Sequence, residues 1–456
     1  STIVNAEAWL PSAIAWAEMR DTIYLQGGTY SANNLLLEET IQVIATGPVE
    51  FVAPSIYPAI RVENDAYPAT ISGVTIRSEG YYNTRYGITV TDSRLILRDC
   101  KFVGIHGVEG AGLFASGASG VTLQNCEFRE IRGEGPFFGG PVYLGGGSLS
   151  AVDCLFQSNG PINWLSPATS VINAYSPSAL NFERCTFTDN DVANGVVFVS
   201  NAGGQTVTFA DCAFVSNIGV GDLAHWDAAA AIFCENAEIV LDRCTVAGTS
   251  SRDGLDYPVA GILKDAASSV SISRSIFAFN HGPAVYAPSG TLGSVSMASS
   301  VVFENLPSYD GPTDQYWVTT GQNVINLNPA FCDETNGDYE LYAFSPASAP
   351  VPPYEEGFFG ERVGAFDVGC VPPAIVTASA SMPISGNPSL VLTCPEGDVV
   401  NSQTGVLSNL VVSVDLNGPI TRSIDRTEVT LDIQPFAVSA VRVFDESGYI
   451  EAGSDA

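Results

Sequence analysis

The segment LILRDCKF, residues 95–102, decides the fold because segments of the same form recur along the chain. Five others share its cysteine: VTLQNCEF (121–128), LSAVDCLF (149–156), LNFERCTF (180–187), VTFADCAF (207–214) and IVLDRCTV (239–246). Two further copies carry serine in its place, VSISRSIF (270–277) and VSMASSVV (295–302), and ISGVTI (71–76) is a weaker one. The marker position recurs every 25–32 residues, a period typical of solenoid proteins.

Apolar residues within each copy alternate, which predicts strands with one face turned inward. A polar pair before the marker breaks the alternation and indicates a corner. A second short apolar run precedes each copy, for example GLFAS (112–116) and PVYLG (141–145). One coil cannot bury its inward row alone, but stacked coils pair every strand with the next and align like side chains. The sequence therefore predicts a parallel β-solenoid.

A second recurrent position lies five residues after the marker. It holds Asn159, Asn190, Asn217, Asn280 and Asn305, and is interrupted by Ile105, Ile131 and Thr249. An asparagine at a recurrent bend hydrogen-bonds the same bend of the next coil. We therefore expect an asparagine ladder with breaks.

Composition excludes several classes of partner. The 456 residues include 18 Lys and Arg against 49 Asp and Glu, a net charge of -31. Nucleic acid and anionic membrane surfaces need a basic face, so neither is expected as a partner. The sequence contains no run of about 18 apolar residues, so membrane insertion is not expected. We expect a secreted or cell-surface protein whose signal peptide has been removed.

The repeat also sets the expected domain boundaries. Residues 1–19 are rich in Ala, Trp and Leu and predict a cap with a short helix over the open solenoid edge. The β-helix is expected over 20–305 and a closing element over 306–373. Short alternating runs over 374–456 predict a small C-terminal β-sandwich of Ig-like shape.

These features resemble the right-handed parallel β-helix (pectin-lyase-like) repeat proteins of secreted bacterial type. The opening RDTIYLQGGTYS (20–31) and the stretch from NPAFCDETNGDYELYAFSP to GAFDVGC (328–370) are similar to the entry and closing elements of that family. The resemblance implies an all-β, right-handed parallel β-helix over about residues 1–370. It leaves the activity open, because the fold serves lyases, hydrolases, adhesins and non-catalytic proteins.

Six of the ten cysteines occupy the marker position: Cys100, Cys126, Cys154, Cys185, Cys212 and Cys244. We expect a core ladder of free thiols, since inward cysteine behaves as a small apolar residue. Their parallel side chains suit neither disulfides nor the converging ligands of zinc, so no metal is predicted there. In the resembling family the closing region often carries cysteine pairs, which implies a disulfide between Cys332 and Cys370.

Carboxylates give only weak candidates for catalysis. Asp189 and Asp191 flank Asn190 of the expected ladder, so a solvated turn is favoured over an active site. The corner acids Asp99, Asp153, Asp211 and Asp242 could hold Ca²⁺, but arginines share these corners and could pair with them. No cofactor is predicted, with Ca²⁺ left as the alternative.

Aromatic residues outside the repeat are the remaining candidates for binding a glycan or a protein partner. The alternative is that each folds its own loop onto the rod. They are Tyr81, Tyr82, Tyr86, Phe137, Phe138, Trp164, Trp226 and Trp317.

We favour a non-catalytic extracellular or cell-surface β-helix protein, structural or adhesive, and a filament-forming or surface-layer subunit is one version. Its partners would be its own copies in a homopolymer, cell-surface components or glycans. The alternative is a polysaccharide lyase, glycoside hydrolase or glycan-binding module acting on the solenoid flank. Converging carboxylates on one strand face would favour the enzyme.

Overall fold

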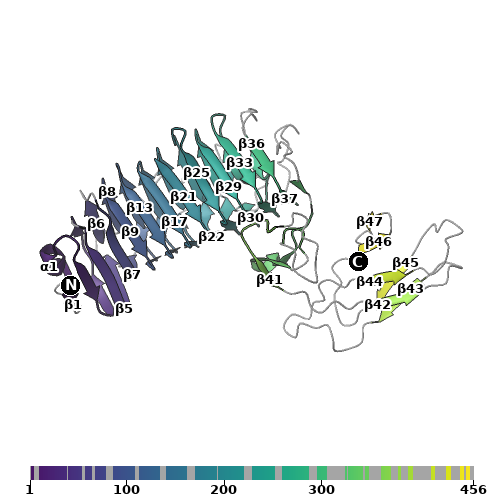
Figure 1. The fold of residues 1–456 in the computed structure, drawn as a ribbon, viewed down its shortest axis with the longest axis horizontal. Coiled ribbons are helices and arrows are strands. Elements are labelled where there is room, and N and C mark those ends of the chain that lie inside the picture. Colours follow the sequence, from purple (N-terminus) through teal and green to yellow (C-terminus); the bar gives the residue numbers. More distant parts are fainter. Residues whose placement is uncertain are drawn as a thin grey trace. The chain divides into compact units, whose positions relative to one another are not determined.

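The computed structural model divides into two compact units, Ser1–Gly369 and Cys370–Ala456. The residues it describes are 2–4, 10–38, 40–53, 57–63, 67–78, 86–107, 112–133, 140–161, 170–192, 194–219, 228–251, 259–286, 295–305, 324–325, 327–342, 345–348, 361–370, 378–381, 389–393, 412–415, 428–432, 442–445 and 448–451. In the first unit, strands follow one another in parallel from β1 (Thr2–Val4) to β37 (Ser300–Phe303), as Figure 1 shows.

Each coil of the first unit contributes to two large parallel sheets. The longer, sheet A, has 22 strands. After β1 they are β2 (Thr22–Leu25), β3 (Gly28–Ser31), β5 (Gln42–Ala53), β7 (Ala69–Ser78), β9 (Arg94–Arg98), β10 (Lys101–Val103), β13 (Gly120–Gln124), β14 (Glu127–Arg129), β17 (Ser148–Val152), β18 (Leu155–Gln157), β21 (Ala179–Glu183), β22 (Thr186–Thr188), β25 (Thr206–Ala210), β26 (Ala213–Val215), β29 (Glu238–Asp242), β30 (Thr245–Ala247), β33 (Ser269–Ser273), β34 (Ile276–Ala278), β36 (Val295–Ala298), β37 and β38 (Val324–Ile325).

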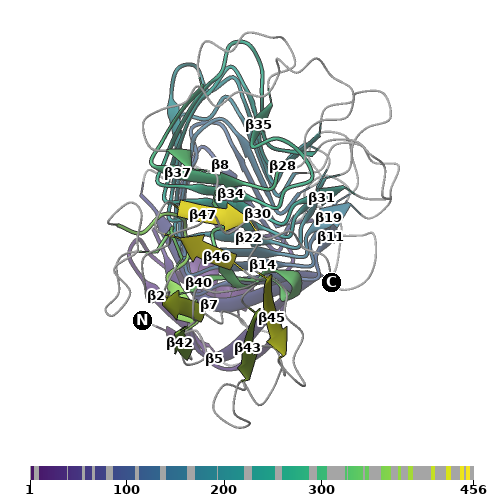
Figure 2. The same cartoon turned by 90° about the vertical axis from the view of Figure 1, so that its right-hand side faces the viewer.

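Sheet B forms the opposite wall of the coil and has 10 strands. They are β4 (Leu35–Leu37), β6 (Ile60–Glu63), β8 (Ile88–Thr91), β12 (Leu113–Ser116), β16 (Val142–Gly145), β20 (Ile172–Tyr175), β24 (Val197–Ser200), β28 (Ala228–Glu235), β32 (Val259–Lys264) and β35 (Val285–Tyr286). Seen along the coils, equivalent strands of successive turns overlie one another (Figure 2).

Short strands follow the bend that lies five residues after the marker, whether or not that position holds asparagine. Sheet C joins β11 (His106–Gly107), β15 (Arg132–Gly133) and β19 (Gly160–Pro161), and sheet D joins β23 (Asp191–Val192), β27 (Ile218–Gly219) and β31 (Ser250–Ser251). The one α-helix among the described residues is α1 (Leu10–Trp16), which buries Leu10 and Ile14. The predicted N-terminal helix is therefore present and short.

The phenylalanines two residues after the marker lie in register, as the repeat predicts. Phe102 pairs with Phe128, and Phe128 with Phe156, in neighbouring coils. The rings of Phe102, Phe128, Phe156, Phe187 and Phe214 stack at centroid distances of 4.5, 5.0, 4.7 and 4.8 Å. We call these five rings the inner phenylalanine column; each is fully buried. The all-β parallel solenoid is confirmed.

All six marker cysteines are buried and free. The Sγ of Cys126 donates to the carbonyl of Leu97 at 3.5 Å, in the preceding coil. Burial is the largest cause that raises the pKa of the Cys212 thiol, so this thiol stays protonated and inert.

The asparagine ladder forms where the sequence places it. Asn190 donates through Nδ2 to the carbonyl of Phe156 at 2.9 Å and to Oδ1 of Asn217 at 3.0 Å. Its own Oδ1 accepts from the backbone N–H of Asn159 at 3.1 Å. Because both ends of each amide are bonded, the bend is held from coil to coil.

The corner before each marker adopts a left-handed backbone. Asp99, Asn125 and Asp153 have φ of 53°, 52° and 55°, a region that Asn and Asp tolerate. Arg184 and Arg243 adopt φ of 50° and 52° at the same corner. Their ion pairs with aspartates of the preceding coil, described below, offset that strain.

A small three-stranded sheet follows the coils: β39 (Phe331–Asp333), β40 (Asp338–Tyr342) and β41 (Val368–Cys370), with a 3-10 turn at Glu334–Asn336. Phe331, Tyr339 and Leu341 pack on the outward side chains of Ala213 and Ile276. This element therefore covers the flank of β26, β30 and β34.

The second unit is described only as strands. β42 (Ala378–Ser381) pairs with β44 (Val412–Asp415), and β43 (Ser389–Thr393) with β45 (Glu428–Asp432), both in parallel. β46 (Arg442–Asp445) and β47 (Gly448–Glu451) form an antiparallel pair. An Ig-like sandwich remains a prediction.

Candidate functional site: an aromatic face on sheet B

Sheet B carries aromatic rings on its outward face, where the core requires none. In each strand the inward positions hold small aliphatic residues, such as Leu113 and Ala115 of β12, while the residue between them points out. Register pairs Phe114 with Tyr143, and Phe198 with Phe233, from coil to coil. Outward aromatic residues at one register position therefore form a stripe along the coils, in which Phe198 is buried and Phe114, Tyr143 and Phe233 are half-buried.

The rings contact one another along the coils. Tyr86 lies 4.8 Å from Phe114, and Phe114 lies 4.8 Å from Tyr143, between ring centroids. The stripe continues through Tyr143, Tyr175, Phe198 and Phe233 at 5.8, 5.3 and 5.3 Å. We call these six rings the outer aromatic ladder.

Between Tyr143 and Phe198, the shared register position holds Asn173 instead of an aromatic residue. Tyr175, two residues further along β20, fills the gap by leaning between Tyr143 and Phe198. Burial raises the pKa of the Tyr143 and Tyr175 hydroxyls, so both remain protonated hydrogen-bond donors at neutral pH. The ladder thus combines apolar rings with polar edges.

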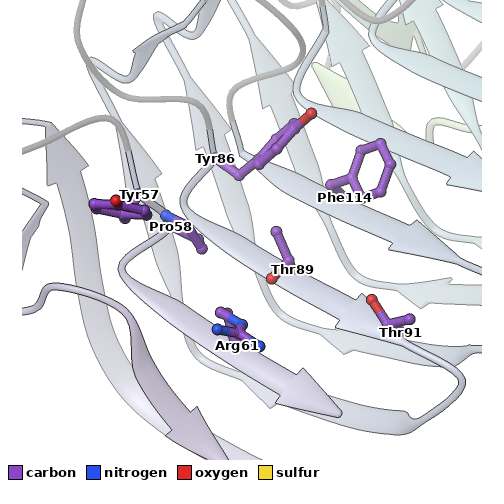
Figure 3. Close-up of a pocket in the computed structure, with 7 residues that line it drawn as sticks. All are labelled: Tyr57, Pro58, Arg61, Tyr86, Thr89, Thr91 and Phe114. Atoms are coloured by element: carbon purple, nitrogen blue, oxygen red, sulfur yellow. The ribbon is translucent and has the colours of Figure 1, made fainter.

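A hollow of about 390 Å³ lies at the Tyr86 end of the ladder (Figure 3). Tyr57 and Pro58 precede β6, Tyr86 precedes β8, and the rest of the lining lies on β6, β8 and β12. The lining residues are Tyr57, Pro58, Arg61, Tyr86, Thr89, Thr91 and Phe114. Tyr57 is 54% exposed, so a ring stands at the mouth with its surface open to solvent.

Arg61 supplies the charge in this hollow. Its Nε and Nη2 donate to Oε1 of Glu63 at 2.8 and 2.6 Å, and Nη1 reaches Oδ1 of Asn34 at 3.4 Å. This pairing holds the guanidinium in place beside the threonine hydroxyls of β8. None of the seven lining residues is an acid or a histidine, so the hollow lacks the pair of carboxyl groups that glycoside hydrolysis uses.

Of the aromatic residues predicted to bind a partner, Tyr86 lies in the hollow. The others fall outside the described residues: Tyr81, Tyr82, Phe137, Phe138, Trp164, Trp226 and Trp317. Sequence reasoning missed Phe114, Tyr143, Phe198 and Phe233, although each stands within one of the short apolar runs that precede the copies, GLFAS (112–116), PVYLG (141–145), GVVFV (195–199) and AAIFC (230–234). The available signal was an aromatic residue at the outward position of these runs.

Asp189 and Asp191 lie on either side of the buried Asn190. Asp189 is exposed with φ of 55°, and its Oδ2 accepts from Thr188 Oγ1 at 3.1 Å and Gln157 Nε2 at 3.4 Å. Asp191 begins β23 on the far side of the bend. Asp189 thus follows the end of β22 and Asp191 begins β23, with the bend at Asn190 between them, and their catalytic role stays a weak hypothesis.

Three of the four corner acids pair with arginines of the next coil, and the fourth, Asp99, accepts from Nδ2 of Asn125 at 2.6 Å. Arg184 contacts Asp153 at 2.6 Å, and Arg243 contacts Asp211 at 2.8 Å. Arg274 likewise pairs with Asp242 at 2.6 Å. Within the described ranges, no group of three or more His, Cys, Asp or Glu residues is arranged to hold a metal ion.

Cys332 forms a disulfide. Its pairing with Cys370 remains a prediction, because the side chain of Cys370 is not among those described. No helix within the described part of the chain is both long and apolar enough to cross a membrane.

One protein-family model matches the middle of the chain. Residues 58–237 match the model of the "Right handed beta helix region" family. A search of curated proteins found no match.

Solved structures give faint likenesses. An alginate lyase of family PL6, in a mutant form, is 11% identical over 95% of this chain and 67% of its own, with a TM-score of 0.32. The A-module of an Azotobacter vinelandii mannuronan C-5 epimerase is 10% identical over 70% and 93%, with a TM-score of 0.32. A second PL6 alginate lyase, in complex with a trisaccharide, is 11% identical over 99% and 91%, with a TM-score of 0.23. Similarity at this level carries no argument about activity.

Proposed function

We propose that this chain is an extracellular glycan-binding protein whose binding surface is the outer aromatic ladder with the hollow at its Tyr86 end. The observation that carries the proposal is a stripe of rings on the outside of sheet B. Inward residues fill the core and leave no packing demand for these rings.

The composition of the hollow matches the chemistry of sugars. A pyranose presents apolar C–H faces to aromatic rings and hydroxyls to polar neighbours. Tyr57, Tyr86 and Phe114 supply rings, while Thr89 and Thr91 supply hydroxyls. Arg61 adds a donor whose position Glu63 fixes. Binding sites of this kind combine mostly apolar walls with a few placed polar groups.

Binding without turnover is favoured over hydrolase chemistry at this face. Glycoside hydrolysis uses a pair of carboxyl groups, and the hollow is lined by none. Glu63, the nearest acid on β6, is engaged by Arg61 at 2.6 Å. Its carboxylate is therefore held as a partner of the arginine.

An extracellular setting is supported by the disulfide at Cys332, since such bonds persist in oxidising compartments. The net charge of -31 with few lysines favours solubility and disfavours polyanionic partners at long range. Secretion, attachment to a surface and assembly of copies into a filament through the C-terminal unit belong to the same proposal.

A glycan array followed by titration tests the function. We expect the full chain to bind at least one glycan without releasing product from it. Tyr57→Ala should weaken that binding about 2- to 12-fold, the value of one ring contact. Tyr67→Ala is the matched control, because both tyrosines precede a proline and are 54% and 56% exposed, but only Tyr57 lines the hollow. Absence of any bound glycan, or equal losses in both variants, would contradict the proposal.

A further inference from the structure

A second polar site lies on sheet C, away from the outer aromatic ladder. His106 of β11 and Arg132 of β15 are register partners in neighbouring coils. Both side chains are partly buried. The next coil places Gly160 of β19 in register with Arg132. Two cationic or potentially cationic side chains thus stand side by side above a glycine.

Gly160 makes room for the guanidinium. A Cβ at this position would lie 2.8 Å from Nη1 of Arg132 and 3.0 Å from Cβ of Asp191. Any side chain at position 160 would therefore displace the arginine or the aspartate. The guanidinium of Arg132 therefore packs against the backbone of Gly160.

Arg132 is unusual for an arginine of this chain. Acids outnumber bases by 49 to 18, and the corner arginines pair with aspartates. The backbone N–H of Arg132 donates to the carbonyl of Ile105 at 2.9 Å. Within the described ranges, its guanidinium makes no hydrogen bond or ion pair, including with Asp191 on the other side of Gly160. A partly buried guanidinium that keeps all five donors available is a ready site for an oxyanion.

His106 adds a second donor at the same place. Burial lowers the pKa of His106, and the positive charge of Arg132 lowers it further because it disfavours the protonated imidazole. An anion bound between the two side chains would relieve this repulsion. Glu130, close enough to raise the same pKa, and Asp191 across the glycine limit the net positive charge.

We propose that Arg132 and His106 form a binding site for a small oxyanion, the carboxylate of an acidic sugar or a sulfate group. Planar guanidinium groups bind both with paired, charge-assisted hydrogen bonds. The site is independent of the proposed glycan binding on sheet B, because it shares no residue with the hollow. The nearby acids predict weak binding that selects a single charged group over a polyanion.

The full chain, with its histidines labelled at Cε1, allows a direct test by NMR. It contains three histidines, so His106→Gln assigns the resonance of His106. Sodium glucuronate and sodium sulfate are titrated separately, with sodium chloride keeping the ionic strength constant. We expect a saturable shift of the His106 resonance with at least one of the two anions. A response to glucuronate alone assigns a carboxylate site, and a response to sulfate alone assigns a sulfate site.

Variants separate a specific site from general charge. Arg132→Gln should weaken binding about tenfold, the value of one charge-assisted pair. Gly160→Ala should also weaken it, and Asp191→Asn should tighten it a few-fold by removing a nearby negative charge. Arg94→Gln, at an exposed arginine on sheet A, is the control and should leave binding unchanged. No saturable shift with either anion, or wild-type affinity in a folded Arg132→Gln protein, would overturn the proposal.

Discussion

The inner phenylalanine column and the outer aromatic ladder use the same kind of side chain along the same coils, but they obey different rules. Rings of the inner column are stacked with interplanar angles of 4°, 11°, 7° and 4°. Those of the outer ladder meet at 42°, 12°, 38°, 61° and 65°. The core dictates the first geometry, because every ring must fill the same space in every coil. The core places no such demand on the outward rings of sheet B, which differ in exposure and include the buried Phe198.

Removing one inner ring should give the largest effect. Phe128→Ala leaves a cavity between Phe102 and Phe156 in a fully buried stack. We expect the free energy of unfolding to fall by about 3–5 kcal/mol. Urea denaturation followed by circular dichroism measures it. A loss below about 1 kcal/mol would mean that the column does not hold the coils together.

The second-largest loss of stability is expected at a partly buried ion pair of the corner. Asp211 is 15% exposed and lies between Arg243 and Arg362. Asp211→Asn should cost about 2 kcal/mol at neutral pH, because two guanidinium groups lose their carboxylate. Asp153→Asn, whose carboxylate is 51% exposed, serves as a control with a smaller loss.

The same pair predicts a pH dependence. The Arg243 guanidinium holds the pKa of Asp211 below its usual value of 3.8. The folded state therefore favours the ionised form, and this stabilisation is present above the usual pKa. It is lost as the pH falls through the lowered, folded-state pKa. Wild type should lose stability more steeply than Asp211→Asn below about pH 4, and parallel curves for the two proteins would contradict this.

Filling an existing break in the asparagine ladder should give the smallest effect, a gain in stability. Thr249 Oγ1 is buried without a hydrogen bond among the described residues. An asparagine there would repeat the bonds of Asn190, with Phe214 and Asn217 as the equivalent partners. We expect Thr249→Asn to raise the free energy of unfolding by about 1 kcal/mol, measured by thermal denaturation. A lowered midpoint would show that the bend at this coil differs from its neighbours.

Sequence alone was sufficient for the inner columns, because Cys126, Phe128 and Asn159 recur at fixed offsets and every coil imposes the same space. The outer ladder gave no such signal. Thr89 and Asn173 interrupt its register position, and Tyr175 enters from a different one. A ligand-binding surface has no reason to repeat, so its members became apparent only when the coils were stacked.

His106 and Arg132 illustrate the same limit. In the sequence His106 is isolated, and 26 residues separate it from its register partner. Their contact depends on the bends at Ile105 and Ile131, which interrupt the asparagine ladder and place each residue first in a two-residue strand. Period and spacing predict the coil, but the pairing of outward residues depends on where each bend ends.

The most direct test compares the affinities of Phe114→Ala and Phe128→Ala for a glycan identified on the array, by calorimetric titration under conditions where both proteins are folded. Phe114 belongs to the outer ladder and lines the hollow, whereas Phe128 belongs to the inner column. We predict that Phe114→Ala binds several-fold more weakly than wild type while Phe128→Ala, although less stable, binds as wild type does. Wild-type affinity in Phe114→Ala would contradict the assignment of the outer aromatic ladder as the binding surface.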